Sequence, residues 1–238
     1  MMVHKINNIA VMQPTFLPWL GYFGLMRSVK YFVFLDDVQF TKQSWQSRNK
    51  IKNLNGDELW LSLPIKKHDL NTNICDIEVQ YESRDLQKII KSYHYSYSKT
   101  NNYHEVQKIL LENFRKKNLA DINISIIEAL RDRLGINIET IRSSELNIKA
   151  DTKEDRLIKI IKNFNSESYL SPPGSKEYLE SDNSLKAFSE NDIEINYFKF
   201  NHPQYEQLGK KFISNLSAVD CISNIGFSRT AKLIEESI

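Results

Sequence analysis

The 238-residue chain is poor in glycine and cysteine, and both shortages exclude familiar kinds of site. It has only 7 glycines, and neither GxGxxG nor GxxxxGK[ST] occurs, so the usual phosphate-binding loops are missing. Its 2 cysteines, Cys75 and Cys221, lie far apart and lack the spacing of metal ligands. Two reduced thiols are therefore favoured over a disulfide or a zinc site, and we expect no bound metal.

Charge and hydrophobicity exclude further classes. Lys and Arg number 32 against 30 Asp and Glu, so no strong positive field favours nucleic acid or an anionic membrane surface. No apolar run is long enough to span a bilayer, and the opening MMVHKINNIAVM is interrupted too early for a secretory signal. We expect a cytoplasmic protein that neither binds nucleic acid nor inserts into a membrane.

The first part of the chain alternates strand and helix patterns. Residues 5–12 and 31–35 look like buried strands, and the helical pattern of residues 20–29 lies between them. This succession predicts a parallel βαβ unit with a right-handed crossover. Residues 47–65 contain two strand-like runs around Asn55-Gly56, which is a strong β-hairpin signal, and residues 74–79 predict another short strand.

The middle of the chain is helical in pattern, and the last third returns to alternation. Apolar residues recur at intervals near three and four in residues 83–97, 103–117 and 121–134. The later predicted elements are strands at residues 136–141, 168–171 and 193–200, and helices from Asp151 or Thr152 to Phe164, from Ser175, and after Gly226. We expect one α/β domain over residues 1–238, with a mostly parallel central sheet flanked by helices, a β-hairpin and a helical insertion at residues 81–135.

Unusual polar and proline-rich segments follow four of the predicted strands directly. They are QPTFLPW (residues 13–19), DDVQF (36–40), SPPGS (171–175) and NHPQYEQ (201–207). In open α/β sheets, ligands bind outside the carboxyl ends of parallel strands. The sequence therefore predicts one pocket formed by these loops.

Three residues in these loops are candidates for acid–base chemistry. Asp36 and Asp37 follow an apolar strand, and either carboxylate is suited to act as a general base. The alternative is that the pair caps a turn. His202 is able to exchange a proton near neutral pH, and its alternative role is a single structural hydrogen bond.

Other residues offer ligand contacts. Gln13 is a neutral donor and acceptor, suited to a sugar hydroxyl or a base edge, and Pro14 fixes its loop. Aromatic faces on which a sugar or base can stack belong to Trp19, Tyr22 and Trp45, although such residues also serve as core. Arg48 and Lys50 are suited to phosphate, with a hairpin edge as the alternative. The remaining residues expected to contact substrate are Gln39, Asn49, Ser171, Gly174 and Tyr205.

Several of these stretches together resemble a known family. QPTFLPWLGYF, VFLDDVQFTKQSWQSRNKIK and LWLSLPIKK, in this order, look like the WbqC-like proteins of bacteria. YLSPPGSKEYL, FNHPQYEQ and the NIG at residues 224–226 fit the same pattern. The family is associated with gene clusters for O-antigen, lipopolysaccharide and other surface polysaccharides, and this implies work on nucleotide-activated sugars.

A second likeness concerns the architecture. Class I nucleotidylyltransferases have an HxGH motif after their first strand, where a helix begins. The corresponding position here holds Trp19-Leu20-Gly21-Tyr22, with an aromatic residue at each histidine position. The likeness implies a nucleotidylyltransferase-like fold, in which Gly21 would let a ligand approach the start of the helix.

The resemblance implies a transferase that attaches an acyl or aminoacyl group to an amine or hydroxyl of a nucleotide-linked sugar. A small-molecule group donor would be the second substrate. His202, Asp36 or Asp37 would be the base, Gln13 and Asn49 would orient the sugar, and Arg48 and Lys50 would hold the diphosphate. Ser171 and Gly174 would supply hydrogen-bond donors from their loop.

Two other functions stay open at this point. One is an adenylate-forming or nucleotidyl-transferring enzyme that uses ATP and Mg²⁺ at the helix start after QPTFLPW. The other is a binding module without catalysis, which holds a nucleotide sugar or a protein partner. The sequence also leaves a homodimer open.

Overall fold

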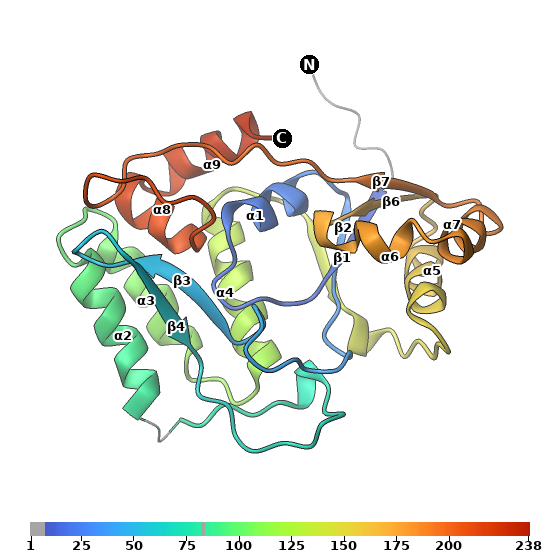
Figure 1. Ribbon diagram of the computed structural model, residues 1–238, viewed down its shortest axis with the longest axis horizontal. Coiled ribbons are helices and arrows are strands. Elements are labelled where there is room, and N and C mark those ends of the chain that lie inside the picture. Colours follow the sequence, from blue (N-terminus) through green and yellow to red (C-terminus); the bar gives the residue numbers. More distant parts are fainter. Residues whose placement is uncertain (1–7, 82–83) are drawn as a thin grey trace.

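The computed structural model describes residues 8–81 and 84–238 (Figure 1). Its centre is a sheet of five strands in the order β5-β2-β1-β6-β7, and each neighbouring pair runs parallel. The strands are β1 (Asn8–Met12), β2 (Tyr31–Phe34), β5 (Glu139–Arg142), β6 (Ser168–Ser171) and β7 (Glu194–Tyr197). The expected α/β fold with a mostly parallel sheet is confirmed.

The sheet grows in two directions from β1. The chain first adds β2 and β5 on one side of β1, and later adds β6 and β7 on the other side. Doubly wound α/β sheets grow from their first strand in the same way. The direction reverses between β1 and β6, so the loops after these two strands diverge and leave a crevice at the carboxyl edge of the sheet.

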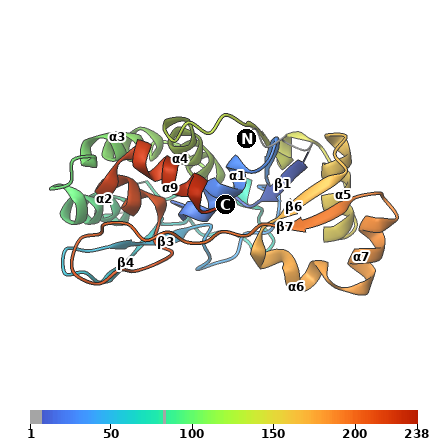
Figure 2. The same ribbon diagram turned by 90° about the horizontal axis from the view of Figure 1, so that it is seen from above.

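Helices cover both faces of the sheet, with α2, α3 and α4 toward one end of the molecule and α5, α6 and α7 toward the other (Figure 1, Figure 2). Alternate residues of β1 face opposite sides: Ala10 lies in the larger hydrophobic cluster, and Ile9 and Val11 lie in the smaller one. Because both faces are covered, β1 and β2 are nearly continuous apolar runs.

The helices of the larger cluster are α1 (Leu20–Arg27), α2 (Arg84–Tyr97), α3 (Tyr103–Asn113), α4 (Leu119–Arg133), α8 (Ala218–Ile225) and α9 (Phe227–Glu236). Those of the smaller cluster are α5 (Lys153–Asn163), α6 (Lys176–Leu179) and α7 (Asp182–Ser189). Among the described residues, no helix combines the length and the apolar character that crossing a membrane requires.

The predicted hairpin forms a separate two-stranded sheet. β3 (Arg48–Lys52) pairs antiparallel with β4 (Glu58–Ser62), and Gly56 in the turn has a φ of 89°, which glycine adopts readily. The inner face buries Ile51 and Leu61 against the larger cluster, whereas Trp60 on the outer face is 43% exposed.

Some predicted elements differ in the structure. Residues 74–79 do not form a strand: Ile74–Asp76 is a 3-10 helix, followed by isolated bridges at Glu78 and Val79. Ile74, Ile77 and Val79 are buried as their apolar character suggested, but the backbone N–H groups of Asp76 and Ile77 donate to the carbonyls of Asn73 and Ile74, as in a helical turn. The strand expected over residues 193–200 ends at Tyr197. Residues 5–7 of the first predicted strand and Ser83 of the first middle helix lie outside the described residues.

Residues 198–217, which we call the strap, connect β7 with α8. The strap runs from the sheet past α9 to the hairpin, as both views show (Figure 1, Figure 2). The buried Lys52 of β3 holds it there, because its ammonium group donates to Gln207 Oε1 at 3.3 Å and to the carbonyl of Lys211. Gly209 approaches the turn so closely that an added Cβ would lie 3.2 Å from Gly56 Cα.

Candidate functional site

A cavity of about 1030 Å³ opens at the carboxyl ends of β1, β2 and β6. It thus lies at the edge where the sheet changes its direction of growth, and in open α/β sheets this is where ligands bind. The loops after these three strands and the start of α5 supply its polar and aromatic lining: Gln13, Thr15, Trp19, Gln39, Thr41, Ser44, Trp45, Gln46, Asp151, Thr152, Lys153, Arg156, Gly174 and Ser175.

At the start of α5 the cavity is lined by two cations and by the carboxylate of Asp151. Lys153 and Arg156 line it from the first turns of α5, whose N-cap is Thr152. The hydroxyl of Thr152 accepts a hydrogen bond from the backbone N–H of Asp155 at 3.1 Å. The first N–H groups of a helix and its dipole favour an anion, and the two side-chain cations add to this effect. This end is therefore suited to a phosphate or carboxylate group.

The other end is aromatic. Trp19 and Trp45 line it, and Trp45 also stacks on Trp60 of the hairpin with ring centroids 5.6 Å apart. A mainly apolar side pocket of about 290 Å³ continues between Trp19, Trp45, Pro18 and Asn215. Flat aromatic faces beside an apolar recess suit a nucleobase or the apolar face of a sugar.

The loop QPTFLPW is held rigidly in an uncommon conformation. Leu17 has a φ of 44°, in the left-handed region that non-glycine residues rarely adopt. The buried amide of Asn49 secures this turn by donating to the carbonyls of Leu17 at 2.8 Å and Phe16 at 3.1 Å. Strain of this kind persists only where surrounding contacts determine the conformation, and it is common at ligand-binding sites.

A second amide ties this loop to the one after β2. Asn123 of α4 is fully buried, and its Nδ2 donates to the carbonyl of Pro14 at 3.0 Å and to that of Gln46 at 2.7 Å. The backbone N–H of Phe16 also donates to the carbonyl of Trp45 at 2.8 Å. The two loops are thus fastened to each other and to α4 as one wall of the cavity.

Asp36 is not among the residues that line the cavity. It is fully buried: the backbone N–H and hydroxyl of Ser144 donate to its carboxylate at 3.0 and 2.9 Å, and Arg142 Nε lies 2.9 Å away. With its oxygens engaged in this way, Asp36 fastens β2 to the end of β5. This position gives no support to the predicted role of Asp36 as a general base.

Asp37 does not line the cavity, but it binds a side chain that does. Its carboxylate accepts hydrogen bonds from Ser143 Oγ and from Arg156 Nη1, both at 2.5 Å. Arg156 lines the cavity and Asp37 does not. The geometry thus makes Asp37 a positioning residue for the Arg156 guanidinium, which differs from the proton-accepting role expected of it.

His202 lies behind Trp19 and does not line the cavity. Its ring stacks on that of Trp19, with centroids 6.2 Å apart and an interplanar angle of 8°. Nε2 accepts a hydrogen bond from the backbone N–H of Asn215 at 3.1 Å, so Nδ1 carries the proton and donates to the carbonyl of Pro203 at 3.0 Å. Burial lowers the pKa of His202 and favours this neutral form. In this geometry His202 supports Trp19, and its position gives no support to the predicted role as a base.

Several residues expected to bind substrate make contacts within the protein and do not line the cavity. Tyr22 is only 1% exposed, and its hydroxyl donates to the carbonyl of Gln13. The hydroxyl of Tyr205 donates to the buried carboxylate of Asp220 at 2.8 Å. Ser171 is fully buried, and Pro14 faces Asn123 through its carbonyl.

Arg48 and Lys50 do not reach the cavity either. They project from the outer face of the hairpin over Trp60, at 4.6 and 5.1 Å from its ring centroid. Lys50 also forms an ion pair with Glu58 at 2.7 Å. The phosphate role predicted for these two cations is thus not supported by their position.

Of the predicted binding residues, five line the cavity: Gln13, Trp19, Gln39, Trp45 and Gly174. Asn49 borders the side pocket, although its amide is committed to the loop carbonyls. Sequence reasoning missed Gln46, Asn123 and Arg156. The predicted N-terminus of α5 at Asp151 or Thr152 was the available signal for Arg156, but no predicted strand precedes that helix directly.

Gly21 has a different role from the one expected. A Cβ on this residue would overlap the indole ring of Trp19, which folds over the start of α1. Glycine is therefore required for the packing of Trp19. The indole also covers the place where a ligand would approach the start of α1, so the comparison with HxGH motifs gains no support at this position.

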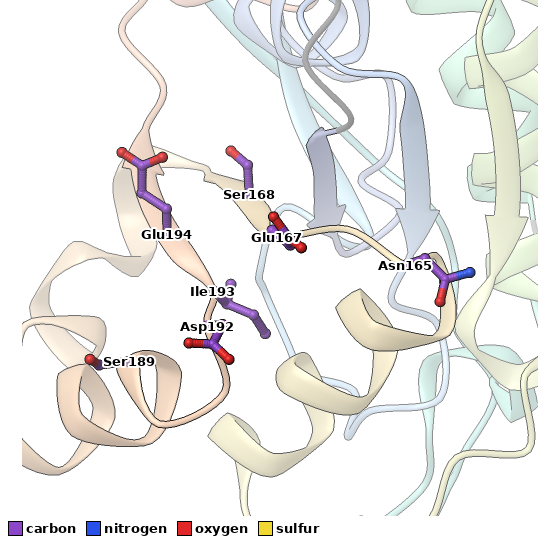
Figure 3. A pocket seen from close by; sticks show the side chains of 7 residues that line it. All are labelled: Asn165, Glu167, Ser168, Ser189, Asp192, Ile193 and Glu194. Carbon is purple, nitrogen blue, oxygen red and sulfur yellow. The ribbon is translucent and has the colours of Figure 1, made fainter.

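Another hollow, of about 700 Å³, lies where β6 and β7 begin, at the opposite edge of the sheet (Figure 3). Glu167, Asp192 and Glu194 line it, and their side chains extend in different directions. Within residues 8–81 and 84–238, no cluster of His, Cys, Asp or Glu is arranged to hold a metal ion. Because ligands bind at the carboxyl ends of the strands in open α/β sheets, the cavity at that edge is the better candidate.

Comparison with known proteins agrees with the motifs. An uncharacterized protein of Mycobacterium tuberculosis, Rv1507c, is 27% identical over 227 residues, which cover 93% of this chain and 95% of the mycobacterial protein. No solved structure matches the chain. The model of the WbqC-like protein family matches residues 13–232, a span that includes nearly the whole cavity lining and the strap. The chain therefore belongs to the WbqC-like protein family.

Proposed function

We propose that the protein is a cytoplasmic transferase that modifies a nucleotide-activated sugar. The reaction is transfer of an acyl or aminoacyl group from a small-molecule donor to an amine or hydroxyl of the sugar, in the assembly of O-antigen or another surface polysaccharide. The observation that carries the proposal is the cavity of about 1030 Å³ at the edge of the sheet where ligands bind, which is lined by Lys153 and Arg156 and by the aromatic rings of Trp19 and Trp45. Ligand pockets typically measure about 300–1,000 Å³, so this cavity is large enough for a ligand of the size of a nucleotide sugar.

The diphosphate binds at the start of α5. Arg156 donates to Asp37 through Nη1, and its other guanidinium nitrogens have no hydrogen bond to the described residues. A guanidinium fixed along one edge offers the remaining N–H groups to phosphate oxygens with little loss of side-chain entropy. Lys153 and the helix N-terminus add positive potential. These groups take the role first expected of Arg48 and Lys50.

The base lies toward Trp19 and Trp45, and the sugar lies beside the diphosphate at the start of α5, near Asp151. Gln13 and Gln39 border the same cavity: no hydrogen bond to the described residues uses Gln13 Nε2, and Gln39 keeps its Oε1 for polar recognition while its Nε2 donates to the carbonyl of Leu70 at 2.7 Å. Trp19 is backed by His202, and Trp45 by Trp60, so both indoles are supported before a ligand arrives. A wall ordered in advance lowers the entropy lost on binding.

Group transfer to an amine or hydroxyl also needs a proton acceptor near the nucleophile. Asp151 carries the one carboxylate among the lining residues of the described chain. We therefore assign the proton-accepting role to Asp151. Asp151→Asn should abolish turnover while leaving the affinity for the nucleotide sugar within about threefold. Normal turnover by this variant would contradict the assignment.

The proposal is tested by calorimetry and thermal shift against UDP-, dTDP-, GDP- and CMP-sugars, with ATP plus Mg²⁺ and acyl-CoA as comparators. One nucleotide sugar should raise the Tm in proportion to the logarithm of its concentration. Arg156→Met should weaken its binding at least about tenfold, because a charge-assisted hydrogen bond contributes about 1.5–3 kcal/mol.

Arg48→Met is the matched control, since it removes the same charge outside the cavity, and it should change the affinity little. Binding of ATP alone would favour nucleotidyl transfer. Tight sugar-nucleotide binding without turnover from any donor would favour a binding module. Absence of binding to every nucleotide sugar would overturn the proposal.

A further inference from the structure

Three groups beside the cavity form a hydrogen-bond relay that begins at the backbone. The N–H of Thr41 donates to Gln46 Oε1 at 2.9 Å. Gln46 Nε2 in turn donates to Gln13 Oε1 at 2.8 Å. Gln46 is only 3% exposed, whereas Gln13 is half-buried and lines the cavity. The relay thus runs from a loop backbone to a side chain that faces a ligand.

The first member of the relay determines the orientation of the other two. A backbone N–H can only donate, so the atom of Gln46 that faces it must be the oxygen. The amide nitrogen of Gln46 then points to Gln13 and requires an acceptor, so the oxygen of Gln13 must face it. This leaves Gln13 Nε2, and no hydrogen bond to the described residues uses its two N–H groups.

We infer that Gln46 is a positioning residue that presents Gln13 to the ligand as a hydrogen-bond donor, and that the ligand group recognised there is an acceptor oxygen. The chemistry that fits is a phosphoryl or carbonyl oxygen, because neither group can donate in return. The inference rests on the proposed function for the identity of the ligand. The polarity of Gln13 rests on the relay alone.

Substitution of Gln46 can reverse this polarity with almost no change of shape. In Gln46→Glu, both oxygens of the new carboxylate accept: one from Thr41 N–H, the other from Gln13. The amide of Gln13 would then turn its nitrogen toward this carboxylate and its oxygen toward the cavity. Gln46→Met removes the relay without imposing either orientation.

The reversal has a readout that needs no ligand. In ¹⁵N–¹H spectra at pH 8, where the new carboxyl is ionised, the side-chain amide protons of Gln13 should exchange with solvent quickly in the wild type. In Gln46→Glu one of them should become protected, because it now donates to the introduced carboxylate. Unchanged exchange of the Gln13 amide would overturn the relay, whatever ligand the protein binds.

Affinity for the nucleotide sugar gives the second readout. Gln46→Glu should weaken binding roughly 10–100-fold, the loss expected when a donor to an anionic oxygen is replaced by an acceptor. Gln46→Met should have a smaller effect, about threefold. Gln87→Glu adds the same charge on the exposed face of α2, and it should change the affinity little.

A double-mutant cycle separates reversal of Gln13 from direct repulsion by the new charge. If the carboxylate introduced by Gln46→Glu acts through Gln13, adding this substitution to Gln13→Met should cost much less than adding it to the wild type. An equal cost in both backgrounds would overturn the inference.

Comparing a nucleoside diphosphate with its complete sugar conjugate identifies the oxygen. If Gln46→Glu already weakens binding of the nucleoside diphosphate, Gln13 donates to a phosphoryl oxygen. If it weakens binding of the sugar conjugate alone, Gln13 donates to the sugar or its substituent. A wild type that binds no nucleotide sugar would refute the proposed function, while the exchange experiment would still decide the relay.

Discussion

Asn123 offers a direct test of how the two cavity loops are held. Replacing it with leucine keeps the branching of the side chain at Cγ and removes the hydrogen bonds to the carbonyls of Pro14 and Gln46. Leaving a buried acceptor unsatisfied costs about 1–3 kcal/mol, so the two carbonyls together lose about 3 kcal/mol. The Oδ1 of Asn123 is itself buried without a hydrogen-bond partner, and its removal returns about 1 kcal/mol. The expected net loss is about 2 kcal/mol in the free energy of unfolding.

Urea denaturation followed by far-UV circular dichroism measures this loss, with the m-value expected to stay unchanged. For a chain of this length, about 2 kcal/mol corresponds to a fall in Tm of roughly 4–8 °C. Ser125→Ala is the matched control on α4, because that hydroxyl bonds only to carbonyls of its own helix, and it should change stability by less than about 0.5 kcal/mol. A loss for Asn123→Leu no larger than that of the control would refute the idea that this amide fastens the loops.

Three further predictions concern the strap and α5. Burial lowers the pKa of His202 below its ordinary 6.5, so the unfolded chain binds more protons at this residue and stability should rise with pH up to about 6.5. His202→Gln should flatten this slope in urea titrations from pH 5 to 8. An unchanged slope would show that His202 does not cause the pH dependence. Gly209→Ala should lower the free energy of unfolding by about 2 kcal/mol or more, because the residue has a φ of 78° and an added Cβ would contact Gly56. Gly135→Ala is the control: its φ is 67° but the space around it is open, so it should lose about 1 kcal/mol. Equal losses of stability in thermal melts would contradict the close approach of Gly209 to Gly56. Thr152→Ala should cost about 1 kcal/mol by loss of the N-cap, and a stability equal to the wild type would show that this cap is dispensable.

The parts of the fold that sequence predicts well are those determined by local patterns. The continuous apolar runs of β1 and β2 and the Asn55-Gly56 turn are local signals, and each predicts its element correctly. Residues 74–79 are apolar enough for a strand, but a strand also needs a neighbouring edge, and the sequence does not specify one. α8 was missed because buried polar residues, including Asp220 and Ser223, interrupt its apolar pattern.

The location of the site was predictable to a greater extent than the role of each residue. The rule that ligands bind at the carboxyl ends of parallel strands indicated three of the loops that line the cavity. The role of a carboxylate or imidazole depends instead on partners remote in sequence. Asp37 accepts a hydrogen bond from Arg156, which is 119 residues away in the sequence, and Asp36 accepts one from Ser144, 108 residues away. No spacing rule connects such pairs, so the sequence could not predict the partners that these two carboxylates have in the structure.

The opening loop shows how a chain so poor in glycine still builds a rigid ligand-facing turn. A left-handed residue other than glycine costs about 1–2 kcal/mol, yet Leu17 is 1% exposed, and burying its side chain contributes about 1.5–3 kcal/mol. Burial therefore offsets the strain, and Asn49 holds the carbonyl that the turn exposes. A glycine at this position would relieve the strain but lose the anchor that keeps Trp19 and Gln13 in place. The conformation of the loop thus rests on two supports, the buried side chain of Leu17 and the amide of Asn49.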